Sequence, residues 1–273
     1  MISIQSGASL AKELFPLIGV HATTMLRLSF ATLVLCSIWR PWKTRLLKRD
    51  VRSILLYGTS LGVMNLTFYL ALERIPLGIA VALEFTGPLA VAFFTSRKPL
   101  DFIWAAFAVA GIILVLPVSQ SSAALDTLGI VYALGAGVCW ALYIIFGQRA
   151  GSGIPSGTAT SLGMLTAALI VLPFGLANAS HSLLNGSTLL LALAVAVFSS
   201  ALPYSLEMIA LKKLPTKTFS ILMSLEPALA ALSGFAFLKE RLTLTQWAAV
   251  GLVIVASLGT SLTSNKAQAC VDP

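Results

Sequence analysis

The sequence predicts an all-α polytopic membrane protein, and three observations carry that prediction. Of the 273 residues, 58% are apolar and only 10% are charged, whereas soluble proteins carry about 25% charged residues. The apolar residues form segments of roughly 20, the length of a membrane-spanning helix, and not the alternating segments of about ten that barrels use. The net charge is +8, and the basic residues cluster in the loops between these segments. Basic residues in such loops determine the orientation of the spans in the membrane, so we expect no nucleic-acid partner.

Nine apolar segments are bounded by charged or turn residues and are predicted to span the bilayer. They lie near residues 20–39, 53–72, 77–95, 102–118, 128–147, 157–177, 188–210, 217–238 and 243–263. The stretch 1–19 is apolar but short, with Lys12 and Glu13 near its middle. We interpret it as the second half of a further helix, which gives a ten-helix protein whose first helix is truncated.

The Lys and Arg residues predict the orientation. One set of alternate loops holds 13 of them, six within residues 40–52, and the opposite set holds 3. Basic loops stay on the cytoplasmic side of the membrane. We therefore expect a multi-pass protein of the bacterial inner membrane with both termini in the cytoplasm.

An internal repeat relates the two halves of the chain. A-L-E-R-I-P at 71–76 matches A-L-K-K-L-P at 210–215, and the same offset places Pro88 on Pro227. Five spans separate the copies, so they face opposite ways, as in secondary transporters built from inverted repeats. The predicted organisation is a first five-helix repeat with an incomplete first helix, a periplasmic linker, a second five-helix repeat and a cytoplasmic tail, at residues 1–118, 119–127, 128–263 and 264–273.

Each predicted repeat carries a glutamate within one turn of a proline. Pro88 lacks the N–H that would pair with the carbonyl of Glu84 in a helix, and Glu226 directly precedes Pro227, where helical geometry is disfavoured. Carboxylates within membrane spans are costly and typical of functional sites. The alternative is a pair of structural helix breaks with glutamates that hydrogen-bond to their neighbours.

Further polar residues lie within the spans. Arg27 can bind a substrate carboxylate through two hydrogen bonds or extend to the membrane interface. Glu207 lies near the cytoplasmic end of its span, so an interfacial role and a site role are both open. A zwitterionic amino acid needs a cationic group for its carboxylate and a carboxylate for its ammonium, and the chain offers both.

Two pairs of residues are spaced to share a helix face. Asn65 and Tyr69 are four residues apart, and Trp140 and Tyr143 are three apart. We expect them to line a pocket beside the glutamates, with helix packing or an aromatic belt as the alternative.

The motifs of enzymes and of ATP-driven pumps do not occur in the sequence. It contains no G-x-x-x-x-G-K-[ST], H-E-x-x-H or G-x-S-x-G, and no Cys/His spacing typical of a metal site. We therefore expect neither an enzyme nor a metal or cofactor. A proton-coupled cycle needs a buried carboxylate that gains and loses a proton, and Glu84 and Glu226 are the candidates.

The sequence resembles the EamA branch of the drug/metabolite transporter superfamily. The residues that carry the resemblance are C-W-A-L-Y at 139–143 and S-L-E-P-A-L-A-A-L-S-G-F-A-F-L-K-E-R-L-T-L-T-Q-W-A-A-V-G at 224–251. Three further stretches are similar to a subgroup of amino-acid exporters: S-I-Q-S-G-A-S-L-A-K-E-L-F-P-L-I-G at 3–19, V-A-L-E-F-T-G-P-L-A-V-A at 81–92 and A-L-P-Y-S-L-E-M-I-A-L at 201–211.

This resemblance implies ten helices in two inverted five-helix repeats, no cofactor, and efflux of threonine, homoserine and similar small amino acids by proton antiport. It also implies a first helix that begins about twenty residues before Met1, one helix length. One alternative is an exporter of drugs or other metabolites that uses a glutamate as counter-ion. A second is a non-transporting membrane scaffold or sensor, which the tail of only ten residues disfavours. The expected partners are substrate, protons and lipid, and formation of a homo-oligomer is left open.

Overall fold

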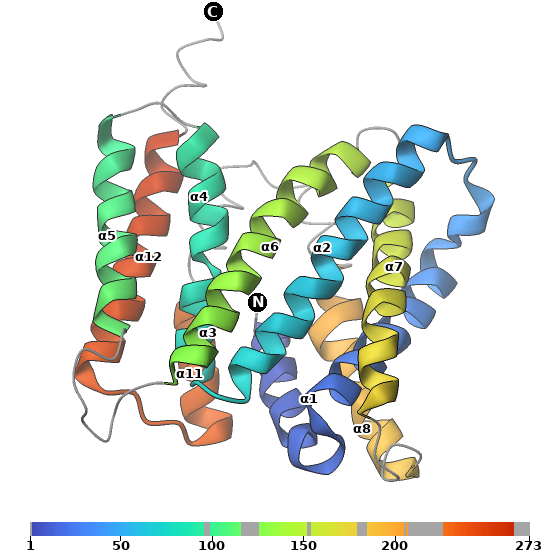
Figure 1. Cartoon of the computed structure of the whole chain (residues 1–273), viewed down its shortest axis with the longest axis horizontal. Helices are drawn as coiled ribbons and strands as arrows, with labels where there is room; N and C mark the ends of the chain where they lie inside the picture. Colours follow the sequence, from blue (N-terminus) through green and yellow to red (C-terminus); the bar gives the residue numbers. More distant parts are fainter. Residues whose placement is uncertain are drawn as a thin grey trace, which may run out of the picture.

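The computed structural model describes residues 2–95, 99–115, 126–151, 154–178, 185–204, 206 and 226–264, and this part of the chain is a bundle of helices without a strand (Figure 1). Five helices in these ranges are long and apolar enough to cross a membrane, and four further apolar helices are shorter. The prediction of an all-α polytopic membrane protein is confirmed.

The helices follow the predicted segments in order. They are α1 (Ile2–Trp39), the 3₁₀ turn η1 (Pro41–Lys43), α2 (Lys48–Leu72), α3 (Leu77–Glu84), α4 (Thr86–Thr95), α5 (Pro99–Val115), α6 (Thr127–Gly151), α7 (Ser156–Ala177), α8 (Gly186–Ala196), the π-helix η3 (Val197–Ala201), α11 (Glu226–Leu238) and α12 (Leu244–Ser264). The predicted span 217–238 is described only from Glu226 onward, and Glu207 lies outside the described residues.

Helix α1 consists of two arms joined at Gly19. This glycine has φ 78° and ψ 162°, a backbone conformation that residues with a Cβ rarely adopt. The chain reverses its direction there, at the bottom of Figure 1. The first arm (residues 2–18) corresponds to the short apolar stretch, and the second arm (residues 20–39) corresponds to the first full-length predicted span.

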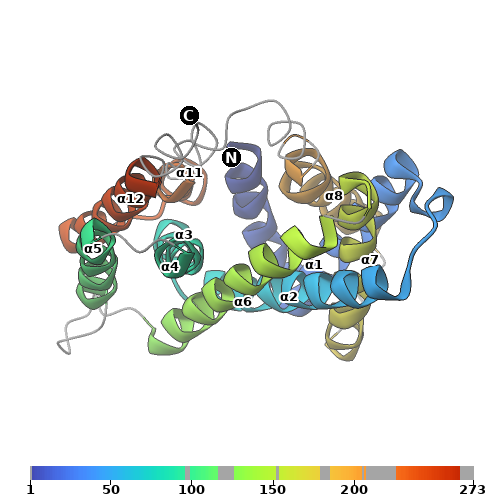
Figure 2. The same cartoon turned by 90° about the horizontal axis from the view of Figure 1, so that it is seen from above.

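Spans that the repeat makes equivalent pack against each other. Helix α5 lies along its counterpart α12, and α3, the first half of the span 77–95, lies along α11, which belongs to the equivalent span 217–238. Seen from above, these helices form one end of an elongated bundle, and α7 and α8 lie toward the other end (Figure 2). Such pairing agrees with two copies related by an axis in the membrane plane. The boundaries of the copies stay a prediction.

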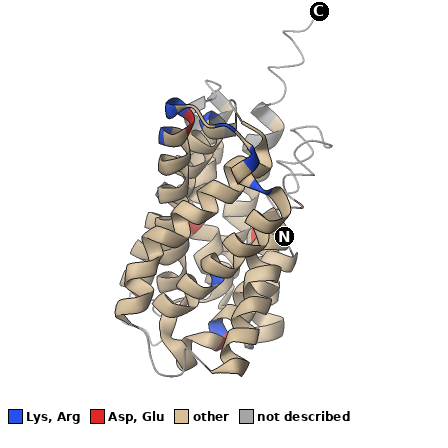
Figure 3. Cartoon of the chain, turned by 90° about the vertical axis from the view of Figure 1, so that its right-hand side faces the viewer, with Lys and Arg blue, Asp and Glu red and all other residues tan. Residues whose placement is uncertain are grey.

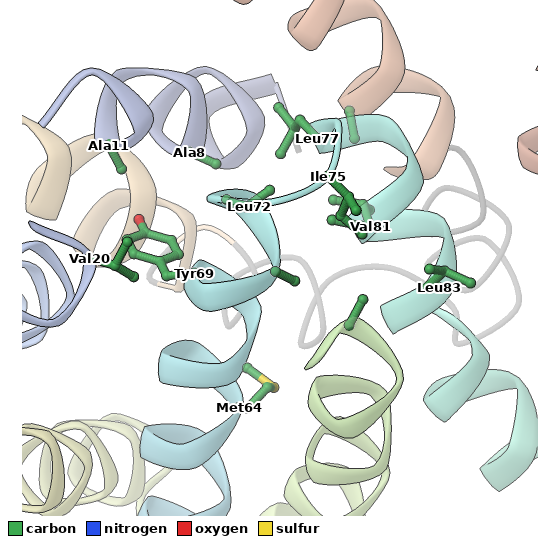
Figure 4. Close-up of a cluster of buried hydrophobic side chains, with 14 of the residues drawn as sticks. Ala8, Ala11, Val20, Met64, Tyr69, Leu72, Ile75, Leu77, Val81 and Leu83 are labelled. Atoms are coloured by element: carbon green, nitrogen blue, oxygen red, sulfur yellow. The ribbon is translucent and has the colours of Figure 1, made fainter. Parts of the chain in front are cut away.

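The apolar core includes side chains of α1, α2 and α3. Figure 4 shows Ala8 and Ala11 of the first arm beside Tyr69 and Leu72 of α2, with Leu77 of α3 close by. All five residues are at most 2% exposed. The small alanine side chains allow the first arm to approach the neighbouring helices closely, as is usual between helices in membranes.

The charged residues are unevenly distributed along the bundle. Figure 3 shows that the Lys and Arg residues of the described chain gather mainly at one end. Figure 1 places the start of α2 at this end, next to the basic loop 40–52. The clustering agrees with the uneven loop charges counted in the sequence.

The carboxylate of Glu240 joins three helices at the opposite end. Its Oε1 accepts a hydrogen bond from Lys12 Nζ of the first arm at 2.7 Å, and its Oε2 accepts one from the backbone N–H of Leu77 at 2.9 Å. Glu240 follows α11, and its backbone N–H donates to the carbonyl of Gly234 in that helix at 3.1 Å. A negative charge at the first turn of α3 is also favoured by the helix dipole.

We predict that replacing Glu240 destabilises the protein more than replacing Lys12. Glu240→Ala removes both the ion pair and the acceptor for Leu77, about 1–3 kcal/mol. Lys12→Met removes only a partly exposed ion pair, about 0.5–1 kcal/mol. Thermal unfolding in detergent measures both, and the double variant should resemble Glu240→Ala alone because the ion pair is shared. Fully additive losses would contradict this account.

Candidate functional site

The break predicted at Pro88 divides one span into α3 and α4. Helix α3 ends at Glu84, and α4 begins at Thr86, so Pro88 lies in the first turn of a new helix, where its missing N–H is tolerated. Helix α3 thus ends at Glu84, within one turn of Pro88; the role of this break in a site stays a prediction. The carbonyl of Glu84 has no helical N–H partner, because the residue four positions on is this proline.

Helix α6 closes over this interruption through glycines. A Cβ on Gly137 would lie 2.8 Å from the carbonyl oxygen of Glu84, and a Cβ on Gly87 would collide with the carbonyl oxygen of Gly137. The two backbones therefore touch, and a Cα–H of Gly137 is the neighbour of the oxygen that Pro88 leaves unpaired. Only glycine fits at these two contacts without a shift of the helices.

The second glutamate lies at the start of a helix. Glu226 is the first described residue of α11 and is 5% exposed, and Pro227 occupies the next position. A carboxylate at a helix N-terminus is stabilised by the helix dipole. Gln5 of the first arm donates a hydrogen bond from Nε2 to Glu226 Oε1 at 3.2 Å. The carbonyl that Pro227 was predicted to release belongs to Met223, which lies outside the described residues.

The two glutamates lie within electrostatic range of each other. Glu84 is 7% exposed and interacts electrostatically with both Glu226 and Arg27. The three residues come from α3, α11 and the second arm of α1. The structure thus brings together three charged groups that the sequence separates widely, inside a bundle whose outer surface is apolar.

Arg27 lies in the interior and does not extend to the interface. It is 5% exposed, its Nε donates to Ser200 Oγ at 2.8 Å, and its Nη2 donates to Asn65 Oδ1. Its guanidinium carbon lies 4.8 Å from the ring centroid of Tyr69, a cation–π contact. These partners are neutral, and no carboxylate of the described residues lies within 4.0 Å of the guanidinium. The prediction that Asn65 and Tyr69 share a face is confirmed.

The aromatic pair on α6 is divided between two contacts. Trp140 meets Phe85, the residue between α3 and α4, edge to face at 5.4 Å. Tyr143 packs against Tyr57 of α2, with hydroxyl oxygens 3.4 Å apart. Trp140 therefore borders the interruption beside Glu84, whereas Tyr143 lies one turn further along α6, and both side chains are half-buried.

Two features of this site were not predicted from the sequence. Gln5 has no motif around it, and only its polarity within an apolar stretch distinguishes it. Ser200 lies in the π-helix η3, a rare element that is frequent at functional sites. The adjacent serines 199 and 200 are the signal that could have identified it, because both are buried within an apolar span.

A multi-pass helical bundle that buries two carboxylates and a guanidinium together is typical of a membrane transporter. The chain belongs to the EamA-like transporter family, whose model matches residues 127–262. The prediction that the chain belongs to this family is confirmed, and so is the prediction that it is a transporter and not an enzyme.

Curated relatives match almost the whole chain. The threonine/homoserine exporter RhtA of Escherichia coli strain K12 is 55% identical over 267 residues, which cover 97% of this chain and 90% of the relative. The protein of the same name from Salmonella typhimurium strain SL1344 is 56% identical over 264 residues, which cover 96% and 89%. One protein of known crystal structure, 16% identical, shares the fold over 98% of this chain and 96% of its own with a TM-score of 0.68.

We predict that adding one methyl group changes the stability of the protein differently at Gly137 and at Gly135, two glycines of α6. Gly137→Ala places its Cβ against the carbonyl of Glu84, so it should cost about 1–3 kcal/mol through overpacking. Gly135→Ala meets nothing within 4 Å, so it should be neutral or stabilising by about 0.5–1 kcal/mol through helix propensity. Thermal unfolding in detergent compares the two variants, and equal stability would show that α6 does not close on the interruption.

Proposed function

We propose that this protein is a secondary exporter of small amino acids such as threonine and homoserine in the bacterial inner membrane. The observation that supports this most is the burial of Arg27 within electrostatic range of Glu84, with Glu226 close by. A site with groups of both signs suits a zwitterion. The names of the relatives more than 50% identical along almost the whole chain point to the same substrates.

In the proposed site, each charged residue has a separate role. The guanidinium of Arg27 has neutral partners, so it can exchange the contacts with Asn65 and Ser200 for a substrate carboxylate, with two parallel hydrogen bonds. Glu84 and Glu226 provide the counter-charge for the substrate ammonium. Asn65, Tyr69, Trp140 and Tyr143 shape the surroundings, and Glu207 would act nearer the cytoplasmic end.

The pair of glutamates also suits proton antiport. Two buried carboxylates in range of each other hold one proton between them more readily than two negative charges. The arrival of a substrate ammonium supplies a positive charge to the same pair, so the proton can leave. Substrate and proton then occupy the pair alternately, which couples export to proton entry.

The proposed architecture is two inverted copies with their helix interruptions, at Pro88 and Pro227, facing a common centre. The packing of α3 with α11 and of α5 with α12 supports it. The copies span residues 1–118 and 128–263, with a periplasmic linker between them, and both termini lie in the cytoplasm with the basic loops. The site would then be reached from each side of the membrane in turn.

The strongest alternative is an exporter of lipophilic cations. Trp140 is aromatic and borders the helix interruption beside Glu84, a combination that suits a cation. The buried guanidinium of Arg27 opposes that use, because it repels a second positive charge in the same interior. A scaffold or sensor would show no substrate counterflow at all, which also separates it from a transporter.

We predict that Glu84→Gln abolishes export of threonine. The amide keeps the size of the side chain but can neither balance an ammonium nor exchange a proton. The assay is exchange of labelled threonine in proteoliposomes, with and without a pH gradient, and Glu73→Gln in an exposed position is the matched control. Correct insertion should be unchanged in both variants. Undiminished, gradient-driven export by Glu84→Gln would remove the proposal.

A further inference from the structure

The side chain of Gln5 is a buried amide in which the nitrogen is hydrogen-bonded and the oxygen is not. It is 2% exposed, and its Nε2 donates to Glu226 Oε1 at 3.2 Å. The other half, Oε1, is buried and has no hydrogen-bond partner in the described part of the chain. Buried polar atoms are nearly always paired, so an unpartnered amide oxygen points to a group absent from the protein itself.

The packing of the first arm fixes this amide beside Glu226. A Cβ on Gly7, two residues along, would lie 2.8 Å from the backbone nitrogen of Ser199, so the arm packs directly on η3. Ser3 Oγ donates to the carbonyl of Phe198 in the same element at 2.6 Å. Gln5 is therefore fixed between η3, which contains the partner of Arg27, and the start of α11, which contains Glu226.

We propose that Gln5 is a substrate-binding residue that completes the site for the ammonium group. This inference rests on the proposed function, an exporter of small amino acids. An ammonium group has three N–H donors and no acceptor, so one carboxylate does not satisfy it in a dry interior. The unpartnered Oε1 supplies a further acceptor next to the carboxylate of Glu226 without adding a charge.

The amide oxygen of Gln5 and the carboxylate of Glu226 together favour binding of a hydrogen-bond donor over binding of an anion. An amide oxygen and a carboxylate side by side repel a substrate carboxylate and attract N–H groups. The Nε2 half meanwhile keeps Glu226 oriented, so a single side chain can position the acid and contact the ligand. A neutral amide also leaves the charge balance of Glu84, Glu226 and Arg27 unchanged.

The test compares threonine with N-methylthreonine, whose ammonium has one N–H fewer, in proteoliposome exchange. Gln5→Met keeps the length of the side chain and removes both amide atoms. We expect the KM for threonine to rise about tenfold, the value of one hydrogen bond to a charged group. The KM for N-methylthreonine should rise clearly less, and the maximal exchange rate should change little. Ser9→Ala is the control in the same arm, because its hydroxyl bonds only to the carbonyl of Gln5.

Each outcome decides the inference. An equal rise in KM for both compounds would mean that Gln5 only supports Glu226, and no rise would mean that the amide does not face the substrate. Either result overturns the proposal. If the wild-type protein exchanges no threonine, the proposed function fails first. If Gln5→Met is not recovered folded, Gln5→Asn, which keeps an amide one methylene shorter, should show the same difference between the compounds.

Discussion

Burial of charge in an apolar bundle is the constraint on which this structure depends. A guanidinium and two carboxylates are each at most 7% exposed, in a chain of which only 10% of the residues are charged. Such groups are expensive in the hydrocarbon interior unless they meet one another, polar neighbours or a ligand. Arg27 meets the neutral partners Ser200 and Asn65, and Glu226 meets Gln5. The neutral partners hold the guanidinium of Arg27 in place through hydrogen bonds that leave its charge unpaired within 4.0 Å in the described part of the chain.

The backbone is adapted to the same end. The helix interruption between α3 and α4 puts Glu84 at a helix terminus, and Glu226 is the first described residue of α11. Glycines at 87 and 137 let α6 close on the first interruption, and the π-helix η3 presents Ser200 to Arg27. Interrupted helices at the centre of the membrane are how secondary transporters expose polar backbone to a substrate without exposing it to lipid.

The sequence predicted the helices well because length and apolarity alone determine a membrane span. The interruption at Pro88 was also predictable, since proline removes a specific hydrogen bond. The contacts of Arg27 were not, because whether a cation turns inward or toward the interface depends on helix rotation, which apolar faces do not encode. Gln5 could not be found either, since its partner Glu226 is 221 residues away. The prediction that Glu207 lies near the cytoplasmic end of its span stays a prediction, because this residue lies outside the described part of the chain.

The central claim is that one ligand with charges of both signs occupies the space among Arg27, Glu84 and Glu226. Binding to the purified protein tests it most directly, with threonine compared with 1-amino-2-propanol, which lacks the carboxylate, and with 3-hydroxybutyrate, which lacks the amino group. Each analogue loses one charged contact, so each should bind at least about tenfold more weakly than threonine. Binding of either analogue as tightly as threonine would contradict the account.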